Sequence, residues 1–457
     1  MLFNSIDFLL FLFIVLGFIA IFRYRKFQHL FLIFSSIFFL YYTDNYLVIL
    51  LVTIILLNFY TGKAIYRANS VKHKKLFFIS GLGGSLGILG FFKYADFTIT
   101  QFNVLGNYLD LTSEIPLLDL ALPIGISFYT FQSLSYIFDI YRGSLKPSQS
   151  LKEFALFVAF FPPLVAGPIL RASQFLPQLR EKIEDVKSSN KLRLFVIHNH
   201  NLKFGITLML IGFFKKIFLA DNIAPLVNNI FSNPIGMESF SIMLGAIAFG
   251  IQIYCDFSGY SDIAIGAAAI FGFKIPLNFN KPFFASSPSD YWTRWHISLS
   301  TWVRDYLYYP LVFKNRQRNI VIFSSLLLSM FLMGLWHGAS WNFVIWGGLH
   351  GIFLAAYTIL RKKYSISTGL FFKSKFGKLF SIIVTQYLIF FTFIAFRIQD
   401  FDHMAYAMKK YIILDFDTIQ TIEIIKNNEF SILLLVLFAI LHYVSYKKGN
   451  LPEKISK

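Results

Sequence analysis

Apolar segments separated by short polar connections dominate the chain. Each is close to the roughly 20 residues that an α-helix needs to cross the hydrocarbon core of a bilayer. They lie near residues 6–22, 29–42, 46–60, 76–92, 123–141, 204–220, 238–255, 319–336, 342–360, 378–396 and 430–446. Because only helices and closed barrels satisfy their backbone in lipid, this pattern predicts an all-α, polytopic membrane protein with about eleven crossings. We expect a single integral-membrane domain over residues 1–457.

One apolar run, residues 154–170, does not fit a simple crossing. Basic residues flank it on both sides, and Pro162-Pro163 and Gly167-Pro168 interrupt it. Proline removes a backbone donor and breaks a helix, so the run predicts a re-entrant element. Irregular backbone at membrane depth must be buried in protein or line a cavity.

The segment 284–310 has a different pattern. It begins at a Ser-Pro-Ser-Asp helix cap, and Asp290 and Arg294 follow at i, i+4. His296, Ser300 and Arg304 then recur every fourth residue on one helical face. We predict an amphipathic helix that lies at the membrane interface or dips into the protein.

Composition and charge narrow the possible partners. Hydrophobic residues make up 56% of the 457 positions and charged residues 14%, with a formal net charge of +18. Lys and Arg gather between the apolar segments, as in cytoplasmic loops that contact lipid headgroups. Nucleic-acid binding has less support, because the sequence shows no soluble basic domain. Basic loops near 23–26, 63–75 and 361–363 place the N-terminus outside and the C-terminus in the cytoplasm. The first segment has no cleavage pattern and predicts a retained helix.

Histidine, arginine, aspartate and tryptophan concentrate between residues 290 and 351. Ionisable groups at membrane depth are costly, so they are usually kept for function. His337, in Trp336-His337-Gly338 at the end of an apolar run, suits a general base that deprotonates a hydroxyl as its oxygen attacks an acyl carbonyl. A structural histidine bonded to a carbonyl at a helix break fits the same position.

Two other histidines have open roles. His296 suits a second acid or base, or a group that orients the acyl donor, but equally an interfacial histidine in an aromatic belt. His350 shares a helical face with Asn342 and Trp346, so it either lines the same cavity or bonds a neighbouring helix.

Metal and soluble-enzyme chemistry receive little support from the sequence. These histidines lack the i, i+3 or i, i+4 spacing of a zinc site, and Cys255 is the only cysteine, so we expect neither a metal site nor an intramolecular disulfide. No nucleophile elbow, phosphate-binding loop or dinucleotide fingerprint is present. Asp256 and Asp262 beside an apolar run suit either ion pairs with arginines of the 294–304 segment or the wall of a substrate pocket.

Several motifs together resemble the membrane-bound O-acyltransferase (MBOAT) family, and within it the AlgI-like branch that O-acetylates bacterial polysaccharides. They are spread in order over residues 120–351, and the hydrophobic profile extends the likeness to nearly the whole chain. The motifs are residues 123–132 (PIGISFYTFQ), 160–162 (FFP), 166–169 (AGPI), 256–262 (DFSGYSD), 294–302 (RWHISLSTW) and 334–338 (GLWHG).

The resemblance implies a helical fold around a central tunnel, with His337 as the essential histidine and His296 as the second one. It implies no bound cofactor, and acetyl-CoA as an acyl donor that arrives from the cytoplasmic side. Residues that we expect along the tunnel are Trp336, Asn342, His350, Arg294, Arg304, Asp305, Asp256 and Asp262.

Acetyl transfer towards hydroxyls of an exported or cell-surface polysaccharide, in a bacterial inner membrane, is therefore the expected function. Expected partners are membrane lipid, a polysaccharide or an intermediate acceptor protein, and a secreted or membrane-anchored SGNH-type acetyltransferase. The resemblance also leaves open the DltB-like branch, which moves D-alanine from a carrier protein towards teichoic acid. A transporter or flippase of an acylated intermediate is the alternative from another class, since broken helices and intramembrane polar residues suit it equally.

Overall fold

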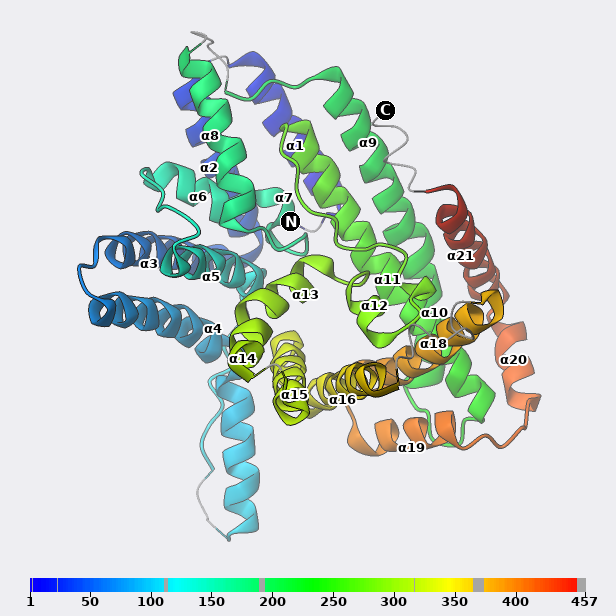
Figure 1. Ribbon diagram of the computed structural model, residues 1–457. Helices are drawn as coiled ribbons and strands as arrows, with labels where there is room; N and C mark the ends of the chain where they lie inside the picture. The colour runs from blue at the N-terminus through cyan, green and yellow to red at the C-terminus, as the bar shows by residue number, and fades with distance from the viewer. Residues whose placement is uncertain are drawn as a thin grey trace. The chain divides into compact units, whose positions relative to one another are not determined.

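The computed structural model describes residues 1, 3–22, 24–110, 114–188, 194–315, 317–364 and 374–449, and this part of the chain is helical without strands (Figure 1). The predicted all-α class is thereby confirmed. The chain divides into two compact units, residues 1–209 with 263–276 and residues 210–262 with 277–457. Two of the three boundaries fall within helices α9 (Asn199–Phe213) and α11 (Ser239–Ile270), and the third follows residue 276 in the connection after α11. Whether the units act as one functional domain stays a prediction.

Unit 1 holds the amino-terminal helices. The chain turns at a short 3₁₀ segment between α2 and α3, and α3, α4 and α5 then pack side by side (Figure 1). Asn58 of α3 donates to the Ser85 hydroxyl of α4 at 2.9 Å and to the Ser133 hydroxyl of α5 at 3.4 Å. Such buried polar contacts link helices that carry mostly apolar side chains. The elements are α1 (Ile6–Ile21), α2 (Arg25–Asp44), η1 (Asn45–Leu47), α3 (Val48–Arg67), α4 (Val71–Tyr108), α5 (Ile126–Arg142), α6 (Leu151–Ala159), α7 (Phe161–Leu164) and α8 (Ala172–Ser188).

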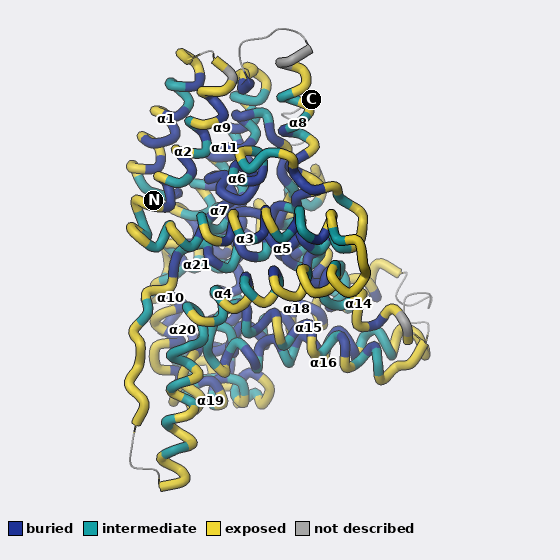
Figure 2. Tube along the Cα trace, turned by 90° about the vertical axis from the view of Figure 1, so that its left-hand side faces the viewer, coloured by how far each residue is buried: buried dark blue, intermediate teal, exposed yellow. Residues whose placement is uncertain are grey.

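The predicted break in the 154–170 run is confirmed. Helix α6 ends at Ala159, α7 occupies only Phe161–Leu164, and Figure 2 shows this region buried. Side chains satisfy the interrupted backbone: the Phe161 N–H donates to Ser36 at 3.3 Å, and the Phe157 carbonyl accepts from Gln132. The broken element is thus enclosed by protein, as irregular backbone in a membrane requires. Its re-entrant position relative to a bilayer stays a prediction.

Unit 2 holds the carboxy-terminal helices and all six tryptophans. Helices α15 and α16 form a tight hairpin, α18 packs on α16, and α10 packs on α21 (Figure 1). Besides its parts of α9 and α11, unit 2 contains the following elements. They are η2 (Phe214–Ala220), α10 (Asp221–Phe231), η3 (Pro282–Phe284), α12 (Pro288–Trp292), α13 (Ile297–Val303), η4 (Arg304–Tyr308), α14 (Tyr309–Val312), η5 (Phe313–Asn315), α15 (Asn319–His337), α16 (Trp341–Tyr364), α18 (Lys375–Arg397), α19 (Phe401–Ile412), α20 (Ile419–Asn427) and α21 (Glu429–Lys448).

The α15–α16 hairpin depends on two glycines that let the helix backbones touch. A Cβ atom added to Gly334 would overlap the Phe343 carbonyl, and one added to Gly347 would overlap the Met330 carbonyl. Small residues at such crossings allow close packing of membrane helices. Because His337 follows Gly334 by one helical turn, the same contact fixes the position of His337 at the hairpin tip.

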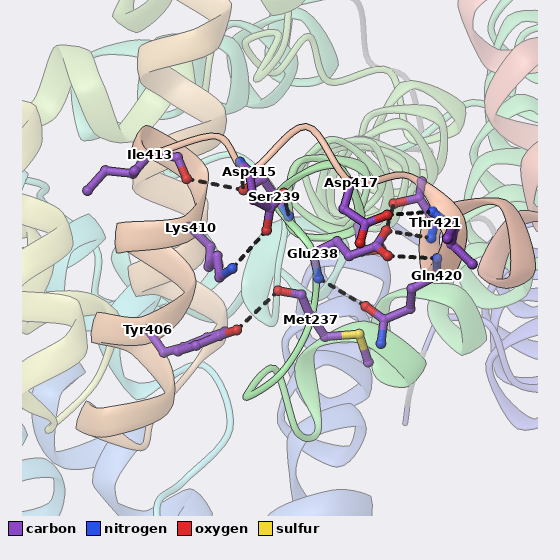
Figure 3. Close-up of polar contacts among 12 residues, drawn as sticks. Met237, Glu238, Ser239, Tyr406, Lys410, Ile413, Asp415, Asp417, Gln420 and Thr421 are labelled. Atoms are coloured by element: carbon purple, nitrogen blue, oxygen red, sulfur yellow. Dashed lines mark hydrogen bonds and ion pairs between the residues drawn. The ribbon is translucent and has the colours of Figure 1, made fainter.

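A polar network in unit 2 joins the start of α11 to the connection before α20 (Figure 3). The Glu238 carboxylate accepts from the backbone N–H groups of Gln420 at 2.8 Å and Thr421 at 3.0 Å, so it caps α20. Beside it, the Ser239 N–H donates to Asp415 at 3.3 Å. A 2.7 Å ion pair with Lys410 lowers the pKa of Asp415 to about 2. This network ties together segments that are far apart in the sequence.

Seven helical stretches of the described chain are long and apolar enough to cross a membrane. They include eight of the eleven predicted apolar segments, because residues 26–67 contain two of them in α2 and α3. The other three segments form the shorter helices α1 and α5 and the continuous pair α9–η2. The polytopic membrane class is therefore confirmed.

The hairpin predicts unequal effects of two adjacent substitutions. Gly347→Ala should destabilise the protein by about 1–3 kcal/mol, because the added methyl group overlaps the Met330 carbonyl across the crossing. Gly348→Ala is the matched control, since a Cβ atom there meets nothing within 4 Å. Alanine in an open helical position should leave the midpoint of thermal unfolding in detergent unchanged or raised. Equal midpoints for the two variants would contradict the assigned contact.

Candidate active site

The segment 284–310 is broken where the sequence predicts one helix. The predicted cap is correct: the Ser287 hydroxyl accepts from the Asp290 N–H at 3.0 Å, with Pro288 at the first helical position. However, α12 ends at Trp292, and α13 begins after His296, which adopts a left-handed conformation with φ 42° and ψ 52°. The single amphipathic helix is therefore wrong. For a residue with a Cβ atom this backbone costs about 1–3 kcal/mol, and surrounding contacts must maintain it.

Aromatic rings surround His337 at the end of α15. The His337 ring lies edge-on to Trp336, Trp346 and Phe396, with centroid distances of 5.0, 5.0 and 5.3 Å. The residue itself is only partly buried. These contacts hold the imidazole of His337 against an apolar wall.

His296 is almost fully enclosed, with 1% of its surface exposed. Its ring lies 4.6 Å from Phe257 and 6.2 Å from Trp336, measured between centroids. Nδ1 lies 3.1 Å from the Asn278 amide oxygen, whereas Nε2 has no hydrogen-bond partner among the described residues. Burial first, and then the charge of His337, hold the pKa of His296 well below its ordinary value. His296 is therefore a neutral imidazole near pH 7, within electrostatic reach of His337.

His350 and Asn342 bond a neighbouring helix. The Thr392 hydroxyl donates to the Ile389 carbonyl at 2.7 Å, so its oxygen accepts from the His350 Nε2–H at 3.0 Å. The Asn342 amide donates to the Ala395 carbonyl at 3.1 Å. Both contacts join α16 to α18. The alternative in which His350 bonds a neighbouring helix is thus the observed one, and His350 also packs 4.8 Å from the Trp346 ring.

Asp256 and Asp262 pair with lysines, so the suggested arginine partners are wrong. Lys215 lies 2.6 Å from Asp262, and Lys216 lies 2.6 Å from both Asp256 and Asp221. Both lysines belong to the π-helix η2, whose wider turn places these consecutive residues against α11.

The remaining charged tunnel candidates form local pairs. Arg294 lies 2.7 Å from Asp290, which confirms the predicted i, i+4 pair. Arg304 lies 2.7 Å from Asp305, and this hydrogen bond raises the pKa of Arg304. The side chain of Arg304 is 50% exposed, so the pair adds little stability. The role of these residues along a tunnel stays a prediction.

A cavity of about 460 Å³ lies within unit 2 between α16, α18 and the start of α12. Apolar side chains such as Phe353, Tyr357 and Leu360 form one wall, and Lys378 and Ser381 of α18 contribute polar atoms. The cavity follows the face of α16 that also carries Trp346 and His350. Among the described residues, no three His, Cys, Asp or Glu side chains gather closely enough to hold a metal ion.

Three residues of this region escaped the sequence analysis as site residues. Asn278 contacts His296 from an irregular connection, Trp346 separates His337 from His350, and Lys215 neutralises Asp262. Only Trp346 had a usable signal, since it shares a helical face with Asn342 and His350. Asn278 and Lys215 reach their partners through tertiary packing.

The fold and these contacts define a multi-pass helical membrane protein with two interacting histidines inside an aromatic cluster. The model of the family described as "MBOAT, membrane-bound O-acyltransferase family" matches residues 144–398, which include His296 and His337. The chain belongs to the membrane-bound O-acyltransferase family, and it is an O-acyltransferase.

Similar proteins from several bacteria cover most of the chain. It is 33% identical over 439 residues to the peptidoglycan O-acetyltransferase of Helicobacter pylori, covering 90% of this chain and 79% of that protein. It is 39% identical over 359 residues to "Probable alginate O-acetylase AlgI" of Pseudomonas putida, covering 78% and 70%. It is 31% identical over 297 residues to the teichoic acid D-alanyltransferase of Bacillus subtilis, covering 61% of this chain and 70% of that protein.

The lysine pairing predicts a testable coupling. Lys215→Met should destabilise the protein because it leaves the Asp262 carboxylate, 17% exposed, without its ammonium partner. Adding Asp262→Asn should recover about 1–3 kcal/mol, since the unpaired charge is then removed. Thermal unfolding in detergent measures both effects. Lys426→Met, an exposed site on α20, is the control; a double variant less stable than Lys215→Met would contradict the pairing.

Proposed function

We propose that the protein transfers an acetyl group from acetyl-CoA, at the cytoplasmic side, towards hydroxyls of an exported or cell-surface polysaccharide. The observation that carries this proposal is the pair His296 and His337, held in electrostatic contact within one aromatic cluster of unit 2. The names of the relatives support an acetyl group and a glycan acceptor, since two of them are called O-acetyltransferase and O-acetylase.

His337 acts as the general base in this proposal. Its imidazole takes the proton from the acceptor hydroxyl while the oxygen attacks the thioester carbonyl. The tetrahedral adduct then collapses, the carbon–sulfur bond breaks, and the imidazolium returns the proton to the leaving thiolate. The overall step yields an acetyl ester and a free thiol. The rings of Trp346 and Phe396 exclude water from one side of this imidazole and favour transfer over hydrolysis.

His296 positions the acceptor in this proposal. Its buried Nε2 atom has no partner within the described chain and lies in the same cluster as His337. A neutral imidazole nitrogen accepts a hydrogen bond, so it can hold a hydroxyl next to the reacting one and direct the reacting oxygen towards the thioester, while His337 takes the proton of the reacting hydroxyl.

The donor and acceptor sides rest on further features. The cavity beside α16 offers an apolar wall together with Lys378, which suits a thioester arm that carries a phosphate-bearing group. The acceptor is either the polysaccharide itself or an intermediate protein that works with an SGNH-type acetyltransferase. The D-alanyltransferase relative favours a second candidate, transfer of D-alanine from a carrier protein.

The proposed location is a bacterial inner membrane. Basic residues gather at the end of α16, with Arg361, Lys362 and Lys363, and at the end of α21, with Lys447 and Lys448. Because basic loops favour the cytoplasmic side, this supports a cytoplasmic C-terminus and an external N-terminus.

His337→Ala provides the decisive test. Purified protein in vesicles is given radiolabelled acetyl-CoA and acceptor polysaccharide, and label on the glycan is measured. Loss of the general base should lower transfer by about 100-fold or more. His403→Ala, which removes a partly buried histidine of α19, is the matched control and should retain full activity.

Three outcomes would overturn the proposal. Folded His337→Ala protein that acetylates at the normal rate would exclude His337 as the base. Label that crosses the vesicle membrane without entering any glycan or protein would support a transporter. Transfer from a D-alanyl carrier protein, with none from acetyl-CoA, would establish the second candidate.

A further inference from the structure

Asn278 lies in the connection between α11 and η3 and is 1% exposed. Its amide oxygen faces three donors: His296 Nδ1 at 3.1 Å, the Ser298 N–H at 3.2 Å and the Ser298 hydroxyl at 2.8 Å. Its amide nitrogen donates to the Ser261 hydroxyl of α11 at 3.1 Å, and its backbone carbonyl accepts from the Ile297 N–H at 2.9 Å. One buried side chain thus joins α11 to the start of α13.

These contacts define the orientation of the amide and the tautomer of the histidine. A backbone N–H can only donate, so the atom of Asn278 that faces the Ser298 N–H is the oxygen. The same oxygen faces His296 Nδ1 and must accept from it. Because a neutral imidazole carries one proton, Nδ1 holds this proton and Nε2 keeps its lone pair.

We propose that Asn278 is a positioning residue that fixes His296 as the Nδ1–H tautomer, so that Nε2 accepts a hydrogen bond from a hydroxyl of the acyl acceptor next to the one that reacts. This inference rests on the proposed function, in which His296 holds the acceptor by that neighbouring hydroxyl. It assigns a role to a residue outside the histidine motifs.

The left-handed backbone of His296 supports this assignment. The Asn278 backbone accepts from Ile297 while its side chain bonds His296 and Ser298, so the turn residue and the two residues after it are tied to one asparagine. These contacts maintain a conformation that a histidine would otherwise leave. They also aim the buried Nε2 atom, which no described residue bonds.

The charges around His296 explain why an amide serves better than a carboxylate. His337, at the end of α15, disfavours the charged form of His296 by electrostatic repulsion. From α11, Asp262 follows Ser261 but pairs with Lys215 of η2, and from α12, Asp290 pairs with Arg294. A neutral amide fixes the tautomer without stabilising an imidazolium, so Nε2 remains an acceptor. A carboxylate at position 278 would favour the charged form.

Asn278→Asp tests this reasoning through the pH profile of acetyl transfer. The carboxylate should raise the pKa of His296, because it faces Nδ1 at hydrogen-bond distance. A higher pKa means that His296 becomes protonated, and Nε2 stops accepting, at a higher pH. At low pH the wild type keeps Nε2 of His296 as an acceptor, whereas Asn278→Asp loses it, so the acidic limb of kcat should lie at higher pH in Asn278→Asp than in the wild type. Asn280→Asp introduces the same charge at an exposed site two residues away and should leave the limb in place.

Asn278→Ala gives a second measurement that does not introduce a buried charge. Loss of the acceptor frees the tautomer and the ring orientation, so kcat should fall by about 10–100-fold, as when supporting partners of ligand histidines are removed. KM for acetyl-CoA should change less than twofold. Tryptophan fluorescence and size-exclusion profiles confirm that each variant is folded.

The outcomes separate the positioning role from the proposed function. If His296→Ala loses activity while Asn278→Ala retains a normal kcat, the positioning role is overturned and the proposed function stands. An unshifted acidic limb in folded Asn278→Asp overturns it equally. If His296→Ala and His337→Ala both transfer acetyl groups normally, the proposed function itself fails.

Discussion

Backbone contact between α15 and α16 is the constraint on which the histidine cluster depends. Gly334 and Gly347 allow the two helices to approach until carbonyl oxygens occupy the space of a side chain. The hairpin then ends in a tight turn that presents His337 against Trp346 of the opposite helix. A wider crossing would separate this imidazole from its aromatic wall. Helix packing in membranes relies on such van der Waals contact, because lipid provides no hydrophobic driving force for the association of apolar helices.

A second level of order comes from hydrogen bonds that fix rings already placed by packing. Thr392 forms a hydrogen bond with one ring nitrogen of His350, and Asn278 forms one with a ring nitrogen of His296. In both histidines the second ring nitrogen has no partner within the described chain. Their surroundings differ, however. His350 bonds a neighbouring helix through Thr392, whereas His296 lies at a strained turn beside the hairpin tip.

Features that depend on interactions between residues close in the sequence could be predicted from the sequence, whereas features that depend on tertiary contacts could not. Apolar periodicity predicted the helices, because helix formation in a membrane depends on local sequence. The Ser287 cap and the Asp290–Arg294 pair were also local and correct. The break at His296 was missed because it is maintained by Asn278, 18 residues earlier, through tertiary contacts. Likewise, Lys215 and Lys216 replaced the expected arginines because a π-helical turn rotates both of them towards α11.

The electrostatic contact between His296 and His337 has a consequence for how protons are stored. Two imidazolium ions in one apolar cluster repel each other, so a proton bound to either ring disfavours binding to the other. Proton uptake by the pair is therefore anticooperative, and the cluster behaves as a reservoir of one proton. In the transfer proposed above, one proton leaves an alcohol and one reaches a thiol, so a single stored proton is sufficient.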